Sequence, residues 1–212
     1  MTHSDALADL LRQRIIDGEF MPGSRLSESA LSNQFEVSRN TLRETYRALA
    51  EQGLLTHVPH RGVSVSAPSM ADVVDIYRCR RTVECTTMRE SRPEHPAVQH
   101  MTDALHLAET HLAAEDWLGI GSANMAFHEG IVALSDSPRL MRMYRNVAAE
   151  LRLVFLTLDD PHALHAPFVA SNRRVLTVFT AEGPEAGALE LERYLLNSER
   201  SVLGAYTRAN RA

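Results

Sequence analysis

Residues 37–55, VSRNTLRETYRALAEQGLL, have the pattern of one amphipathic helix with a marked beginning and end. Ser38 is a residue type that caps helix N-termini, because its hydroxyl can accept a bond from a free backbone N–H of the first turn. Leu42, Tyr46 and Leu49 recur at helical spacing and form one apolar face. A glycine then ends the pattern. The stretch therefore predicts a helix that begins after Ser38 and ends near residue 52.

Further elements are predicted on both sides of this helix. Residues 6–16 carry their apolar side chains on one helical face, and Ser27 is a second N-cap that begins a short helix before residue 37. The apolar stretches 54–57 and 63–65 are separated by turn residues, which is typical of a β-hairpin. Helix, turn, helix and hairpin together predict a winged helix-turn-helix over residues 1–66, whose second helix of the pair enters the DNA major groove.

The start of the 38–52 helix carries side chains that can bind DNA. Arginine can donate two hydrogen bonds to a guanine edge, and Ser, Thr or Asn can bond bases or phosphates. The candidates on this helix are Ser38, Arg39, Asn40, Thr41, Arg43 and Arg47. At the hairpin tip, Arg61 can reach a phosphate or a neighbouring groove, and Gly62 lets the backbone approach closely. An ordinary solvated face, with arginines paired to Glu36, Glu44 or Glu51, remains the alternative.

A second domain is predicted from residue 70 to residue 208. Small residues and a proline at 66–69 separate the hairpin from a long helical pattern, and each later break contains a proline that cannot continue the preceding helix. The pattern predicts five or six helices in a bundle. We expect a mainly α protein: an N-terminal winged helix-turn-helix with a small β-hairpin and a C-terminal all-α bundle.

Composition and motifs exclude several classes of protein. The formal net charge of -5 argues against non-specific coating of nucleic acid, although it allows a local basic patch. No Gly-rich phosphate loop, His-Glu-x-x-His motif or nucleophile elbow is present, so we do not expect an enzyme. No apolar run is long enough for a membrane span or a signal peptide, which predicts a cytoplasmic protein with no membrane partner. His95, His100, His106 and His111 miss metal-pair spacing and are predicted to be surface residues.

The stretch from Ile15 to Val65 resembles the DNA-binding domain of the GntR family of transcriptional regulators. The motifs that carry the resemblance are PGSRLSE (22–28), VSRNTLRE (37–44), LAEQGLL (49–55) and RGV (61–63). The resemblance implies that the candidates Ser38, Arg39, Arg43 and Gly62 contact DNA, and we add Arg25 to the candidate set. One residue departs from the family pattern, because Ser29 stands where members often carry an Arg.

Residues 70–208 resemble the helical ligand-binding (FCD) domain of the FadR-type branch of that family. The cues are DIYRCRRTVE (75–84), FH (127–128), SDSPRL (135–140) and the amphipathic final helix. Many members hold a divalent metal with one Asp and three His, and the positions that match these ligands here are Asn124, His128, Asn172 and Tyr194. Neutral amides are poor zinc or nickel ligands, so we expect no metal and no other cofactor.

We expect the four matching side chains to form a polar pocket that binds a ligand. Arg80 is then the partner for an anionic group of that ligand. In the alternative, Arg80 pairs with Glu84 one turn later and His128 is a satisfied core histidine.

These features predict a sequence-specific DNA-binding transcriptional regulator. The commoner behaviour of the family implies a repressor whose DNA affinity a small anionic metabolite, such as a carboxylate, modulates. Two reading helices across a two-fold axis can read a palindrome, so we expect a homodimer on a palindromic operator. The alternative is an architectural DNA-binding protein whose C-terminal dimerisation domain is filled and senses nothing.

Overall fold

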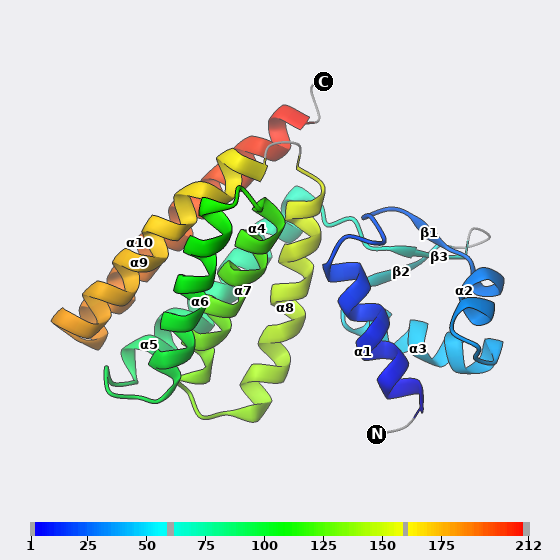
Figure 1. The fold of residues 1–212 in the computed structure, drawn as a ribbon, viewed down its shortest axis with the longest axis horizontal. Coiled ribbons are helices and arrows are strands. Elements are labelled where there is room, and N and C mark those ends of the chain that lie inside the picture. Colours follow the sequence, from blue (N-terminus) through cyan, green and yellow to red (C-terminus); the bar gives the residue numbers. More distant parts are fainter. Residues whose placement is uncertain (1–2, 59–61, 159–160, 210–212) are drawn as a thin grey trace. The chain divides into compact units, whose positions relative to one another are not determined.

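The chain folds into two compact units (Figure 1). The computed structural model describes residues 3–58, 62–158 and 161–209. The first unit comprises Met1–Pro68 and Ala149–Thr157, and the second comprises Ser69–Ala148 and Leu158–Ala212. The boundary expected at residues 66–69 coincides with the first division, whereas the sequence analysis did not place residues 149–157 with the N-terminal unit.

In its described residues, the first unit contains helices and short strands. Its elements are α1 (His3–Ile16), β1 (Arg25–Leu26), α2 (Glu28–Gln34), α3 (Arg39–Glu51), β2 (Leu55–Val58) and β3 (Gly62–Val65). The hydroxyl of Ser27 accepts a bond from the backbone N–H of Ala30 at 3.3 Å, and that of Ser38 accepts one from Thr41 at 3.1 Å. The two serines therefore cap α2 and α3, as the sequence predicts.

The three strands form one antiparallel sheet in the order β1-β3-β2. Ser64 of the central strand lies opposite Arg25 of β1 and Thr56 of β2. The β2–β3 hairpin follows α2 and α3 and completes the winged helix-turn-helix that the sequence predicts. The pattern missed β1, because a strand of two residues is too short to show an alternation.

The core of the first unit includes residues far along the chain. Leu11 and Ile15 of α1 pack with Leu42 and Leu49 of α3, and the fully buried Leu153 belongs to the same cluster. Gly53 lies beside this segment with a left-handed φ of +77°, and a Cβ there would lie 2.6 Å from the carboxyl carbon of Glu150. Segment 149–157 thus completes a core that residues 1–66 alone leave open.

The second unit is helical throughout. Its elements are α4 (Met70–Arg80), the π-helical turn η1 (Arg81–Cys85), α5 (Thr86–Arg89), α6 (Ala97–Ala113), α7 (Trp117–Ala133), α8 (Pro138–Leu156, whose last residues belong to the first unit), α9 (Pro161–Glu182) and α10 (Pro184–Ala209). Three of these helices begin at the prolines expected to end their predecessors, because proline suits the first helical position. Pro167 is an exception inside α9. The prediction of a mainly α fold is confirmed.

His95 is the histidine that the sequence analysis placed wrongly. It is buried, its Nε2 lies 3.1 Å from Asp136 Oδ2, and its Nδ1 accepts a bond from the backbone N–H of Ala97 at 3.1 Å. The prediction of a surface residue came from metal-pair spacing alone. Sequence spacing does not show that the loop before α6 packs against the turn after α7, which brings His95 to Asp136.

We expect Leu153→Ala to destabilise the first unit although it lies outside residues 1–66. A fully buried Leu truncated to Ala costs about 2–5 kcal/mol of unfolding free energy. Urea denaturation followed by the near-ultraviolet signal measures the change. The control is Leu189→Ala, because Leu189 is 44% exposed. Equal stability of Leu153→Ala and the wild type would contradict the assignment of this segment to the core.

Candidate functional site

The N-terminal end of α3 presents its polar side chains to solvent. Arg39, Asn40, Arg43 and Arg47 are exposed, whereas Leu42, Tyr46 and Leu49 of the same helix are buried. The hydroxyls of Ser38 and Thr41 lie 2.8 Å apart at the helix start. The exposed polar face and the buried packing face of α3 are therefore separate, and the predicted candidates on this helix lie on or beside the exposed face.

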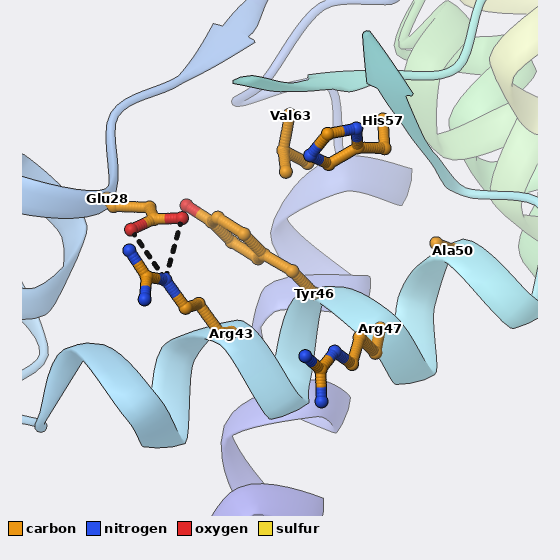
Figure 2. A pocket seen from close by; sticks show the side chains of 7 residues that line it. All are labelled: Glu28, Arg43, Tyr46, Arg47, Ala50, His57 and Val63. Carbon is orange, nitrogen blue, oxygen red and sulfur yellow. Dashed lines mark hydrogen bonds and ion pairs between the residues drawn. The ribbon is translucent and has the colours of Figure 1, made fainter. Parts of the chain in front are cut away.

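Arg43 and Arg47 line a hollow of about 310 Å³ together with His57 and Val63 of the hairpin strands (Figure 2). We call this the α3 hollow. The carboxylate of Glu28, at the start of α2, accepts bonds from the Nε–H of Arg43 at 3.0 and 3.2 Å. Both bonds use Nε, so the pair orients the guanidinium and keeps its terminal Nη groups out of the contact. Those Nη groups can donate hydrogen bonds to a guanine edge or to a phosphate.

Tyr46 lies directly beside this ion pair (Figure 2). Its hydroxyl is buried and has no hydrogen-bond partner among the described residues. Burial and the nearby Glu28 charge raise the pKa of Tyr46 well above its ordinary value. The phenol therefore stays protonated at neutral pH, and its O–H group has no acceptor among the described residues.

A second, larger hollow of about 610 Å³ gathers the candidates outside α3, and we call it the β1 hollow. Arg25 of β1, Arg39 and Gly62 line it, with Glu28 shared between the two hollows. Gly62 has a left-handed φ of +86°, and a Cβ there would lie 3.6 Å from the guanidinium of Arg25. Ser29, where relatives often carry an Arg, also lines this hollow. Arg61 lies outside the described residues.

The sequence analysis missed Glu28, Tyr46 and His57 as members of this surface. It took Glu28 as a first-turn residue of α2, Tyr46 as core, and His57 as part of a hairpin strand. The alternative partners Glu36, Glu44 and Glu51 all lie near α3 in sequence, whereas Glu28 lies 15 residues before Arg43. Only the packing of α2 against α3 brings that pair together.

In the second unit, α7, α9 and α10 bring together the four side chains that match the family's metal ligands. Asn124, His128, Asn172 and Tyr194 are all buried. Asn172 Nδ2 donates to Asn124 Oδ1 at 2.7 Å, and the Tyr194 hydroxyl lies 3.3 Å from the same oxygen and 3.1 Å from His128 Nε2. Asn172 Oδ1 is buried with no partner among the described residues. We call this set, together with Arg80, Glu84 and Tyr144, the polar cluster.

Glu84 is the hub of the polar cluster. Arg80 Nε donates to its carboxylate at 2.7 Å, His128 Nδ1 lies 2.7 Å from it, and the Tyr144 hydroxyl donates to it at 2.5 Å. Arg80 and Glu84 are both buried. The geometry is the one that the sequence analysis left open as its alternative, with Arg80 held by Glu84.

The charges of the cluster follow from this geometry. Burial alone would raise the pKa of Glu84, but Arg80 and His128 outweigh it and lower the pKa to about 2. Burial lowers the pKa of His128, with Arg80 acting in the same direction against the opposing effect of Glu84. A neutral ring then donates its Nδ1–H to Glu84 and accepts at Nε2 from the Tyr194 hydroxyl. The ionised Glu84 and the Arg80 cation balance each other.

The four matching residues do not fit a divalent metal. Burial raises the pKa of Tyr194 far above its ordinary value, which disfavours the anionic form that binds a metal. Both ring nitrogens of His128 lie within hydrogen-bond distance of protein partners, and the other two donors are amides. Within residues 3–58, 62–158 and 161–209, no three His, Cys, Asp or Glu side chains gather as a metal site. The absence of a physiological metal remains a prediction.

Comparison with known families follows this division of the chain. The profile of the bacterial regulatory proteins of the gntR family matches residues 3–65, and the profile of the FCD domain matches residues 75–197. The chain belongs to the GntR family. Members with these two domains are transcriptional regulators rather than enzymes, with an N-terminal domain that binds DNA and an FCD domain that binds small-molecule effectors.

Individual relatives agree with the family assignment. The chain is 33% identical over 174 residues to an HTH-type regulator of Streptomyces ambofaciens, covering 80% of this chain and 72% of that one. It is 31% identical to YdhC of Bacillus subtilis, over 65% of this chain and 62% of YdhC. It is 39% identical to the repressor RspR of Escherichia coli, over 39% of this chain and 36% of RspR. The match thus spans less than two thirds of YdhC and of RspR.

A GntR chain of known structure from Rhodococcus sp. RHA1 has the same fold. It superimposes with a TM-score of 0.92 at 38% identity, over 97% of this chain and all of that one. Escherichia coli McbR/YncC, at 18% identity and a TM-score of 0.81, shares the fold.

None of the helices in the described part of the chain combines the length and the apolar character that a membrane crossing requires.

We expect Glu28→Ala to reduce the ratio of specific to non-specific DNA affinity by about threefold to tenfold, because Arg43 loses the partner that orients it. Removing a carboxylate from a phosphate-facing surface also strengthens non-specific binding. Fluorescence anisotropy measures both affinities at fixed salt, with one duplex that the wild-type protein selects from a random pool and one duplex of scrambled sequence. The control is Glu51→Ala, at the other end of α3. A ratio that stays at the wild-type value would show that Glu28 does not orient Arg43 for reading.

We expect Glu84→Gln to destabilise the protein by about 3 kcal/mol at pH 7, because a buried Arg80 is left without its counter-ion. Glu185→Gln, which removes an exposed partner of Arg89, is the control and should change little. Urea denaturation gives both values.

The pH dependence has a defined sign. The folded-state pKa of Glu84 lies below its ordinary value of 4.5, so its contribution is complete above pH 4.5 and is lost as the pH falls toward 2. The stability gap between the wild type and Glu84→Gln should therefore narrow over that range. A gap that is constant with pH would contradict an ionised Glu84.

Proposed function

We propose that the chain is a cytoplasmic, homodimeric repressor that reads a palindromic operator through α3 and the wing and releases it when a small anionic metabolite binds the FCD domain. The observation that carries the DNA-binding part of the proposal is the gathering of Arg25, Arg39, Arg43 and Arg47 around two adjoining hollows along α3. All four arginines are exposed, as the reading side chains of such a motif must be.

The charges of this surface favour a selective reader over a general DNA binder. Four arginines supply attraction for phosphates, while Glu28 lines both hollows and repels them. We therefore expect the binding free energy to be most favourable for a duplex that places a base edge within reach of the Nη groups of Arg43. The formal net charge of -5 further weakens binding that depends on charge alone.

Two features of the polar cluster support a sensing role for the second unit. Asn172 Oδ1 is a buried acceptor with no partner among the described residues, and leaving such an atom unpaired costs free energy that a donor on a ligand can recover. Glu84 joins residues of α4, α7 and α8 through bonds that a new partner can redistribute. Because Arg80 is already neutralised, an anionic ligand must either compete with Glu84 or bind elsewhere.

The second candidate function is an architectural DNA-binding protein with a filled C-terminal domain. The observation that favours it is that Arg80, Glu84, His128 and Tyr194 satisfy one another by hydrogen bonds. A ligand-induced loss of DNA affinity separates the two functions, because a filled domain binds no ligand and so cannot change the DNA affinity in response to one.

The DNA half is tested by selecting duplexes from a random pool with the wild-type protein. We expect a palindromic consensus, and Arg43→Ala should lose more than about tenfold in affinity for it at fixed salt. Arg173→Ala is the control, since Arg173 is an exposed arginine of α9 in the second unit. A consensus without two-fold symmetry would contradict recognition of the operator by a homodimer. Full affinity in Arg43→Ala would show that α3 is not the helix that reads the DNA.

A further inference from the structure

A hollow of about 280 Å³ lies between α9 and α10 in the second unit. We call it the α9–α10 hollow. The two helices run side by side in Figure 1. The volume of the hollow lies just below the range of about 300–1,000 Å³ that is usual for ligand pockets, so a small metabolite fits it better than a drug-sized one.

The rim of this hollow carries more positive than negative charge. Arg174 of α9 and Arg193 of α10 both bond to the single carboxylate of Glu190, at 2.6 and 3.0 Å. Among the residues that line the hollow, two arginines therefore share one carboxylate. Glu182, outside the lining, is a second negative charge that acts on Arg174. The two arginine side chains are about two thirds exposed, so a ligand anion can reach both of them.

The rest of the lining offers hydroxyl groups. Ser171, Ser198, Ser201 and Tyr194 line the hollow, and an amide is added by Asn197. Hydroxyls both donate and accept, so they suit a ligand that carries hydroxyl groups of its own. The hydroxyls of Ser171, Ser198 and Tyr194 already bond to Pro167, Tyr77 and His128, and ligand hydroxyls can exchange with these partners.

The floor of the hollow is part of the polar cluster or bonded next to it. Tyr194 is buried and its hydroxyl lies 3.1 Å from His128, which in turn bonds to Glu84. The Ser198 hydroxyl lies 2.6 Å from that of Tyr77, whose ring lies 5.2 Å below the guanidinium of Arg80. Two chains of contacts thus lead from the floor to the buried ion pair.

We propose that the α9–α10 hollow is the effector site and that its ligand is a small anion that also carries hydroxyl groups. The anionic group binds Arg174 and Arg193 at the rim, and the ligand hydroxyls compete for the hydroxyls of Tyr194 and Ser198 at the floor. The polar cluster then transmits binding rather than enclosing the ligand. This inference rests on the proposed function, because it names the effector class and site of that regulator.

The test uses D-glycerate and L-tartrate at about 10 mM, with glycerol and threitol as uncharged polyol controls, since a ligand of the folded state raises the melting temperature. The proteins are the wild type, Arg174→Gln/Arg193→Gln, and Arg173→Gln, which removes the neighbouring arginine that pairs with Glu109 instead. Release of the selected duplex is measured on the same samples.

We expect at least one hydroxy acid to raise the melting temperature of the wild type and of Arg173→Gln, while its polyol does not. The double variant should bind that acid on the order of tenfold or more weakly by calorimetry, because charge-assisted bonds are lost. An equal response of the double variant overturns the hollow as the site while the proposed function stands. No response to either acid overturns the ligand class. Failure of the wild type to select any duplex overturns the proposed function itself.

Discussion

The buried ion pair of Arg80 and Glu84 is the constraint on which the second unit depends. A carboxylate with no exposed surface is tolerated only where cations and donors surround it, and Glu84 has Arg80, His128 and Tyr144 around it. These partners come from α4, α7 and α8, so the helices cannot move independently without breaking a charge-assisted bond. The π-helical turn η1 carries Glu84 four residues after Arg80, which joins the two within one turn.

The polar cluster departs from the metal-binding pattern that the second unit resembles. Where relatives gather an aspartate and three histidines, this chain presents two amides, one histidine and a phenol, and the histidine already bonds to Glu84. The bonds that His128 and Tyr144 make to Glu84 join η1 to α7 and α8, so these cross-links between helices do not require a metal. In the proposed function, a ligand in the hollow between α9 and α10 rearranges hydrogen bonds of this cluster.

Sequence reasoning succeeded where the information is local. Ser27 and Ser38 cap their helices, and helices begin at Pro138, Pro161 and Pro184, because capping and proline geometry involve only neighbouring residues. It failed where the decisive contact spans the chain. Glu28 meets Arg43, Tyr144 meets Glu84 across 60 residues, and Leu153 completes the N-terminal core. No periodicity connects such positions, so only tertiary packing reveals them.

The central claim is that an internal ion pair, rather than a bound metal, holds the polar cluster. Elemental analysis together with native mass spectrometry of the purified protein tests it most directly, because both report every bound metal and any small molecule retained by the fold. We expect the mass of the chain with no stoichiometric divalent metal. One metal ion per chain, lost in His128→Ala, would contradict it and would show that Asn124, His128, Asn172 and Tyr194 still form a metal site.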